Sequence, residues 1–299
     1  ANKNTTWETT TQTNIGIDFS ILGSFNFTLD YFDKITDDIL LQIPIPITMG
    51  NLTAPYQNVG KVKNRGFELS ANWNKRFSND LQLSTTLNTS FIKNEILDLY
   101  GRSPIISEMT VLMEGQAINS FYGYKTDGLY QISDFEWQNN SDKSIPYKER
   151  NYVLKKGVVA VQNYTAQPGD LKFKDLDGDG VVTMSKDRTV IGKQFPDMTY
   201  SLQANVRWKN FDLGVFLQGV AGIDGYTYQE ISTPFSNRSN SGAWWKGRWT
   251  YDNQEAKFPR LIKDDTRTNL HSEFYVEDAS YLRLKNVELG YTIPKYITS

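Results

Sequence analysis

The chain has 299 residues, of which 32 are Lys or Arg and 34 are Asp or Glu, so its formal net charge is -2. This balance, and the lack of any basic run interleaved with aromatic residues, argues against a nucleic-acid partner. The sequence has no cysteine, which excludes disulfides and thiol chemistry, and no apolar run approaches the roughly 18 residues of a membrane-spanning helix.

In the N-terminal third of the chain, apolar and polar residues alternate along four stretches. Strict alternation of this kind predicts strands that have one apolar and one polar face. The four predicted strands cover residues 14–21, 25 to about 41, 61–75 and 81–92. The connection between the second and the third contains Pro44 and Pro46, which have no N–H to donate to a sheet and therefore indicate an irregular loop.

A predicted hairpin follows further along the chain, with arms at 199–208 and 211–218 joined by Lys209 and Asn210. Each arm has about ten residues, the length that a tilted strand needs to cross the hydrocarbon core of a bilayer. Trp208 and Phe211 flank the turn, where an aromatic girdle at a membrane interface would lie. A soluble β-sandwich would show the same alternation, so the hairpin alone does not decide between the two.

The last predicted strand covers residues 281–293. Its apolar positions change parity near Lys285 and Asn286, which predicts a β-bulge. Aromatic residues gather beside the short turns between the predicted strands: Phe19, Phe25, Trp73, Trp208, Phe211 and Tyr291.

The connections between these strands alternate strictly in length. Short turns lie at 22–24, 78–80 and 209–210, and long connections at 42–60, 93–197 and 222–280. Outer-membrane barrels have short periplasmic turns and long extracellular loops, whereas a soluble sandwich has no reason to sort its loops by end. We therefore predict an all-β chain, a transmembrane antiparallel β-barrel segment of about seven strands. Residues 93–197 form one large extracellular loop region in this prediction, with a local strand at 121–124.

Within that loop region, acidic residues recur at alternate positions before Gly180, as in the first half of an EF-hand-type calcium loop. The candidate ligands are Asp175, Asp177, Asp179, the carbonyl of Val181, Thr183 and Asp187. The twelfth position, where a bidentate acid is expected, is Lys186. Two hypotheses stay open: a structural calcium site that closes one residue late on Asp187, or an Asp/Gly turn that binds nothing. A catalytic metal is not expected, because no histidine or cysteine is near.

Several segments, taken in order, carry a resemblance to one family. They are WETTTQTNIG (7–16), NVGKVKNRGFEL (58–69), PGDLKF (168–173), RTVIG (188–192), FPR (258–260) and DASYLRLKNVELGY (278–291). Together they resemble the SusC/RagA family of TonB-linked outer-membrane nutrient transporters, and the match covers nearly the whole chain. The late closing acid of the Asp/Gly loop is the one departure from the family pattern.

The resemblance implies that residues 1–299 are a partial TonB-dependent receptor β-barrel domain. The complete barrel would have about 22 strands and would lie in the outer membrane of a Gram-negative bacterium. A plug domain and the segment that contacts the TonB–ExbB–ExbD complex are expected to precede residue 1, and the final strands are expected to follow residue 299. The expected partner is a SusD-like surface lipoprotein that lids the barrel, and the expected substrates are oligosaccharides or peptides.

Loops hold five of the seven tryptophan residues, and Trp244, Trp245 and Trp249 form one cluster. These three are predicted to contact the substrate or the lid protein, and packing within the loop is the alternative. Six charged residues alternate with the apolar positions of the strands and are expected to face the lumen, since a charge that faces lipid is costly. They are Asp18, Asp30, Glu68, Arg207, Asp212 and Glu288.

No catalytic group is evident. His271 is the only histidine, and no serine lies in a strained nucleophile-elbow context, so we expect no enzyme activity. Two other functions stay open at this point. One is a soluble all-β carbohydrate-binding module with a calcium-stabilised loop, and the other is a passive porin without a plug.

Overall fold

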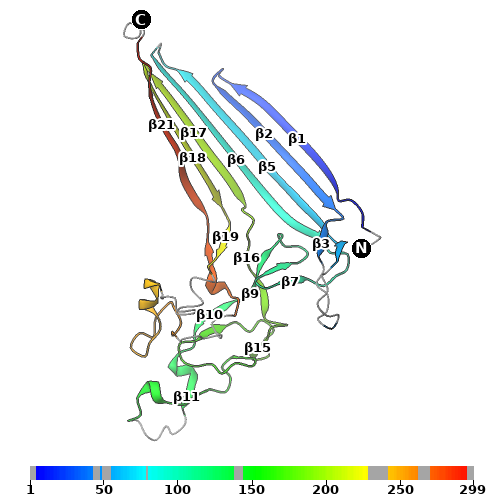
Figure 1. The fold of residues 1–299 in the computed structure, drawn as a ribbon, viewed down its shortest axis with the longest axis vertical. Coiled ribbons are helices and arrows are strands. Elements are labelled where there is room, and N and C mark those ends of the chain that lie inside the picture. Colours follow the sequence, from blue (N-terminus) through cyan, green and yellow to red (C-terminus); the bar gives the residue numbers. More distant parts are fainter. Residues whose placement is uncertain are drawn as a thin grey trace.

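The computed structural model describes residues 5–42, 48, 55–78, 80–137, 144–227, 242–261 and 270–294. Its main element is a seven-stranded sheet in the order β1-β2-β5-β6-β17-β18-β21. These strands are β1 (Thr9–Ile21), β2 (Phe25–Asp37), β5 (Lys61–Arg76), β6 (Leu81–Asp98), β17 (Met198–Trp208), β18 (Phe211–Ala221) and β21 (Tyr281–Tyr291). Each pairs antiparallel with its neighbours, and together they form one tilted wall (Figure 1). The prediction of an all-β chain with seven long strands is confirmed.

The register gives the wall one apolar and one polar face. One row of directly paired residues crosses all seven strands: Phe19, Phe27, Ala71, Leu87, Leu202, Leu217 and Leu284. The adjacent row is Asp18, Thr28, Ser70, Asn88, Ser201, Gln218 and Arg283. Paired residues share a face and successive residues alternate between faces, so the first row covers one face and the second the other.

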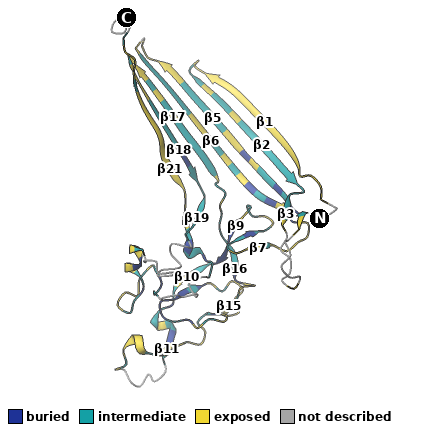
Figure 2. Ribbon diagram, in the orientation of Figure 1, coloured by how far each residue is buried: buried dark blue, intermediate teal, exposed yellow. Residues whose placement is uncertain are grey.

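No buried cluster covers the apolar face within the described residues. The buried hydrophobic residues lie at the loop end of the sheet or in the loops, and none comes from β17 or β18 (Figure 2). Large apolar side chains on this face stay open, among them Ile15 and Leu289, which are 62 % and 76 % exposed. A sheet of a soluble sandwich would bury this face against a second sheet.

The connections are sorted by end of the wall, as predicted. The three tight hairpins lie at the end where the C-terminal strand finishes, and the long connections gather at the other end (Figure 1). Aromatic rings meet across strands near the hairpins: Phe25 and Trp73 have ring centroids 5.6 Å apart, and those of Phe211 and Tyr291 are 4.8 Å apart. The predicted bulge is also confirmed, because Phe216 pairs with Asn286 and Leu217 pairs with Leu284, which leaves Lys285 over.

Several strand limits differ from the prediction. β1 begins five residues before residue 14, because its polar start pairs normally with β2. β6 ends six residues after residue 92, because it goes on pairing with β5 past a one-residue shift in register at Leu97. β2 ends at Asp37, since Asp38 has a φ of 58° that interrupts the ladder. The chain resumes pairing in β3 (Leu40–Gln42) with β4 (Tyr56–Asn58). Pro44, Pro46 and Asn79 lie outside the described residues.

Between β6 and β17 the described chain forms short strands of two to five residues and the 3-10 helices η2 (Ile132–Asp134) and η3 (Tyr147–Glu149). The strands are β7 (Ile105–Ser107), β8 (Thr110–Leu112), β9 (Ser120–Tyr124), β10 (Thr126–Leu129), β11 (Phe135–Trp137), β12 (Tyr152–Leu154), β13 (Ala160–Val161), β14 (Leu171–Phe173), β15 (Val181–Val182) and β16 (Arg188–Gly192). The expected local strand is β9. No helix within the described ranges is long and apolar enough to cross a membrane.

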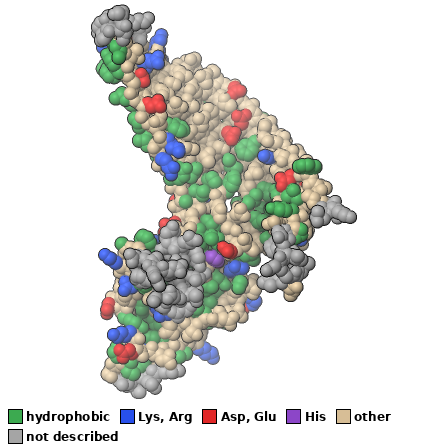
Figure 3. Space-filling view, viewed as in Figure 1, with side chains coloured by type: hydrophobic (Ala, Val, Ile, Leu, Met, Phe, Trp, Pro, Cys, Tyr) green, Lys and Arg blue, Asp and Glu red, His purple; other side chains and the backbone are tan. Residues whose placement is uncertain are grey.

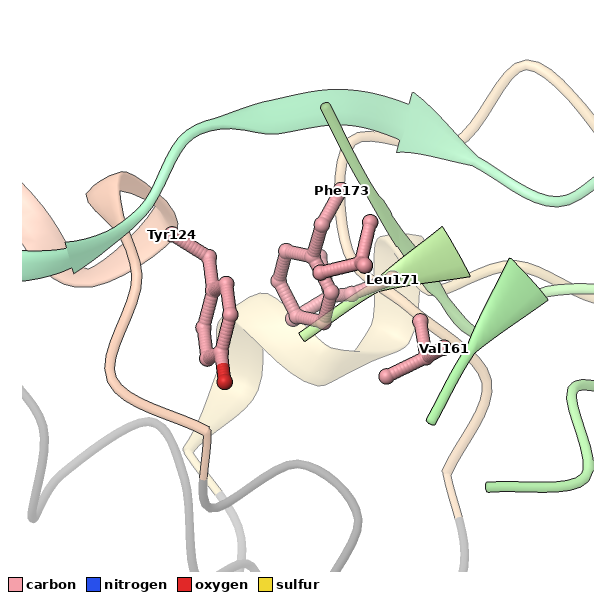
Figure 4. Packing of buried hydrophobic residues seen from close by; sticks show 5 residues of the cluster. Tyr124, Val161, Leu171 and Phe173 are labelled. Atoms are coloured by element: carbon pink, nitrogen blue, oxygen red, sulfur yellow. The ribbon is translucent and has the colours of Figure 1, made fainter. Parts of the chain in front are cut away.

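This loop region has its own hydrophobic interior. Tyr124, Val161, Leu171 and Phe173 converge from β9, β13 and β14, and Val182 of β15 completes the cluster (Figure 4). The rings of Tyr124 and Phe173 have centroids 5.1 Å apart. The region is therefore held by burial of its own apolar side chains, at the end of the wall opposite the hairpins.

Candidate functional site

Two long connections, 99–197 and 222–280, come together beyond the end of the wall. Within the second connection, β19 (Asp224–Tyr226) pairs with β20 (Val276–Asp278). The two connections meet where the N–H of Tyr124, in the first, donates to the carbonyl of His271, in the second, at 2.9 Å. Gly123 lies directly beneath that carbonyl, so closely that an added Cβ would stand 2.3 Å from its oxygen. The two connections therefore form one folded body, here called the crown.

The segments FPR (258–260) and PGDLKF (168–173) meet inside the crown. Arg260 of the FPR segment donates from Nε and Nη2 to the carboxylate of Asp170 in the PGD segment, at 2.5 and 3.3 Å. The N–H of Arg260 also donates to the carbonyl of Gly169 at 2.7 Å. The Asp170 side chain is 4 % exposed and accepts a further bond from the N–H of Gln167. This forked, buried pair joins the two connections, and the sequence alone did not reveal it.

The tryptophan cluster divides into two buried residues and one exposed residue. Trp245 and Trp249 are each 3 % exposed, whereas Trp244 is 46 % exposed on the short 3-10 helix η5 (Ala243–Gly247). The ring of Trp249 lies over Gly169, whose φ of +88° and lack of a Cβ permit the approach, and its Nε1 donates to Gln131. Trp245 packs against Phe258 and Tyr275. The two buried tryptophans pack inside the crown, whereas Trp244 is open to solvent.

The Asp/Gly loop satisfies its carboxylates largely with its own donors. Asp175 accepts from the N–H groups of Gly178 and Gly180, and the latter bond holds the pKa of Asp175 below its usual value. Asp187 is fully buried and accepts from the N–H of Leu176 at 2.7 Å and from the N–H and hydroxyl of Thr183 at 2.6 and 3.2 Å.

The one cation of the loop is Lys186. Its Nζ lies 2.8 Å from Asp177 and 2.7 Å from Asp179, which lowers the pKa of Asp179 and raises that of the lysine. Carboxylate oxygens of Asp175, Asp177 and Asp187 nevertheless lie within 4.8 Å of one another. Three hard oxygen donors at this spacing suit a calcium ion. The other predicted ligands make contacts of their own: Asp179 binds Lys186 and accepts from the N–H of Val181, and the hydroxyl of Thr183 donates to Asp187.

The six charged residues predicted to alternate with the apolar positions all lie on the polar face of the wall. Asp30 pairs directly with Glu68, Arg207 with Asp212, and Gly214 with Glu288, while Asp18 accepts a 2.6 Å hydrogen bond from Thr28. Figure 3 shows acidic and basic side chains scattered over a wall surface drawn mostly in the colour of the backbone and of the uncharged polar side chains, with some hydrophobic side chains between them. The face suits contact with water and polar solutes.

His271 lies at the junction of wall and crown and is half-buried. Its Nδ1 is 3.2 Å from the hydroxyl of Tyr226, and burial lowers the pKa of the imidazole. The imidazole of His271 lies beside the ring of Tyr226, and the carbonyl of His271 accepts a hydrogen bond from β9. These contacts give it a structural role in the crown.

The family model for the TonB dependent receptor-like β-barrel matches residues 1–298. TonB-dependent receptor P3 of Formosa agariphila is 31 % identical over 308 residues, covering 99 % of this chain and 28 % of the relative. TonB-dependent receptor SusC of Bacteroides thetaiotaomicron is 26 % identical over 294 residues, covering 97 % of this chain and 26 % of SusC. The chain thus spans less than a third of the length of these relatives.

Among solved structures, that of the RagAB peptide transporter matches with a TM-score of 0.74 and 22 % sequence identity. The match covers 99 % of this chain and 30 % of the solved chain, so the wall and the crown share that fold.

Proposed function

This chain belongs to the TonB-dependent receptor-like β-barrel family, and on that premise we propose that it forms part of the wall and crown of an importer for oligosaccharides or peptides. The protein is a TonB-dependent outer-membrane receptor related to SusC, with the fold seen in RagAB. Its relatives are receptors and transporters rather than enzymes.

The observation that supports the proposal most strongly is the two-faced wall. A continuous apolar row crosses seven strands, a polar row lies beside it, and the two outer strands, β1 and β21, each pair on one edge only within the described part of the chain. Hydrocarbon provides no hydrogen-bond partners, so a wall of this kind requires further strands on both edges to close into a barrel. We propose that the rest of the receptor supplies them.

The proposed mechanism divides the work between crown and wall. Substrate binds at the crown beneath a SusD-like lipoprotein, and TonB then draws on a plug domain outside this chain to open the lumen. The polar face lets a hydrated solute pass, since its serine, threonine and asparagine side chains exchange hydrogen bonds with water at little cost. Trp244 is the residue of this chain that we propose for contact with the substrate or with the lipoprotein.

Deleting the receptor gene should abolish uptake of its nutrient by the bacterium, and collapsing the proton gradient in the wild type should have the same effect. Uptake of labelled oligosaccharides and peptides by whole cells measures both. A passive porin would keep transporting without the gradient. A soluble carbohydrate-binding module would leave the membrane fraction with high salt alone, whereas this protein should require detergent.

We also propose that the Asp/Gly loop binds a structural calcium ion weakly, through Asp175, Asp177 and Asp187. The support is the convergence of their oxygens, and the opposing factor is the ammonium of Lys186 beside Asp177.

Replacing Lys186 with methionine removes the competing charge and should tighten calcium binding by about fivefold, the upper end of what one exposed charge contact contributes. Isothermal titration of the purified receptor measures the affinity. Lys148, exposed and outside the loop, gives the control variant K148M. If neither the wild type nor K186M binds calcium at millimolar concentration, the loop is a turn without a metal.

A further inference from the structure

The crown contains a groove of about 720 Å³. Ligand pockets commonly span about 300–1,000 Å³, so the groove is large enough for part of a substrate. Its walls come from β10, from residues 254–258, and from the segment 273–277 that carries the start of β20. The groove therefore lies where the two long connections of the crown face each other.

The charges around the groove are mainly negative. Glu255, Glu273 and Glu277 line it, against the single cation Lys257. Glu273 is held in place by the N–H and hydroxyl of Thr126, at 3.2 and 3.0 Å. Glu255 and Glu277 are exposed and form no ion pair with any residue in the described ranges, so they are free to bind a cationic group.

The apolar part of the groove does not offer the flat ring faces that sugars stack on. Phe258 and Phe274 both line it, but they pack edge-to-face on each other, with ring centroids 5.8 Å apart and an interplanar angle of 88°. Both rings are also partly buried against the core of Trp245 and Tyr275. This floor suits aliphatic chains, such as the methylene stem of a lysine, better than a pyranose face.

Residues of β10 and β20 line the groove. Within the residues that the structure describes, β10 pairs only with β14 and β20 only with β19, so each has one edge outside a sheet, although the N–H of Thr126 on β10 already donates to Glu273. A strand with an open edge can accept an extended peptide as an additional strand, and the side chains of that peptide then reach the flanking pockets. An oligosaccharide has no amide ladder with which to use such an edge.

We propose that this groove binds an extended, basic segment of a peptide substrate, with a lysine or arginine side chain beside Glu255 and Glu277. The inference rests on the proposed import function and narrows it from two substrate classes to peptides of basic character. The groove would be a capture site outside the bilayer, engaged before the substrate enters the lumen.

Fluorescence anisotropy on the purified full receptor tests the assignment. The probes are an end-capped hexapeptide alternating lysine and alanine, its counterpart with glutamate in place of lysine, and maltohexaose, each labelled. The lysine peptide should bind the wild type most tightly. The double variant E255Q/E277Q should weaken it about tenfold, and K257E should tighten it about threefold, as expected for exposed charge contacts. E136Q/E149Q, which alters two exposed glutamates outside the groove, should leave it unchanged.

Equal binding of the lysine and glutamate peptides, or undiminished binding to E255Q/E277Q, would overturn the groove assignment. Whole-cell uptake is measured alongside and reports on the import function separately. If the receptor imports its nutrient but does not bind the lysine peptide, the import function stands and the groove assignment is overturned. If the receptor binds the lysine peptide through Glu255 and Glu277 but supports no energy-dependent uptake, the groove assignment stands and the import function is overturned.

Discussion

Arginine in place of Leu202 should prevent the receptor from assembling in the outer membrane, whereas arginine in place of the adjacent Gln203 should leave assembly intact. Leu202 lies near the middle of β17 in the apolar row that crosses all seven strands. An arginine facing lipid near the midplane costs about 2–4 kcal/mol, a large fraction of the net stability of a typical domain. Gln203 is the next residue on the strand and points to the polar face, where an arginine stays hydrated.

Heat-modifiable migration of the receptor from isolated outer membranes measures the folded fraction of each variant. The Q203R variant controls for the size and charge of arginine at nearly the same depth. Equal folded fractions for L202R and Q203R would show that the apolar face does not contact lipid.

A second large effect is expected inside the crown. Replacing Asp170 with alanine leaves the guanidinium of Arg260 without its buried partner and the N–H of Gln167 without its acceptor. Removing one member of a fully buried pair costs about 3–5 kcal/mol, and since the Arg260 side chain is 25 % exposed we expect about 2–3 kcal/mol here. The crown should then become sensitive to protease at a lower temperature, while the wall, which shares none of these contacts, keeps its folded form.

The matched control is Asp127, which pairs with Lys172 at 3.5 Å and has a side chain that is 51 % exposed. Exposed pairs contribute about 0–1 kcal/mol, so D127A should change protease resistance little. The double variant D170A/R260A should lose less than the sum of the two single variants, because the pair acts as one unit. Additive losses would mean that the two side chains contribute independently.

The strands of the wall were predictable because the signal for them, the alternation of apolar and polar residues, is local in the sequence. Alternation with a period of two shows which residues share a face, and a change of parity at Lys285 marks the bulge, without knowledge of distant contacts. The strand ends were less predictable. The threonine-rich start of β1 continues its pairing, but there both faces are polar and alternation vanishes. The end of β6 also continues its pairing, but the adjacent apolar residues Ile96 and Leu97 at a shift in register break the alternation there.

The crown was less predictable, because its contacts join residues far apart in the sequence. Asp170 and Arg260 are 90 residues apart, and neither is distinguished by its neighbours from an exposed charge. Trp244 and Trp245 are adjacent and chemically identical, yet one is exposed and the other buried. Lys186 shows the same limit, since its position in the loop was evident but its contact with two carboxylates depends on how the turn closes.

The crown's interior, built around Tyr124, Leu171 and Phe173, contains no side chain from the middle of the wall. Substitutions in one part therefore leave the energetics of the other almost untouched, since distant sites without shared partners act additively. Under the proposed function, selection can therefore change substrate recognition in the crown while the membrane-spanning strands stay constant. A bacterium could then adapt to a new nutrient by substitutions in the crown alone.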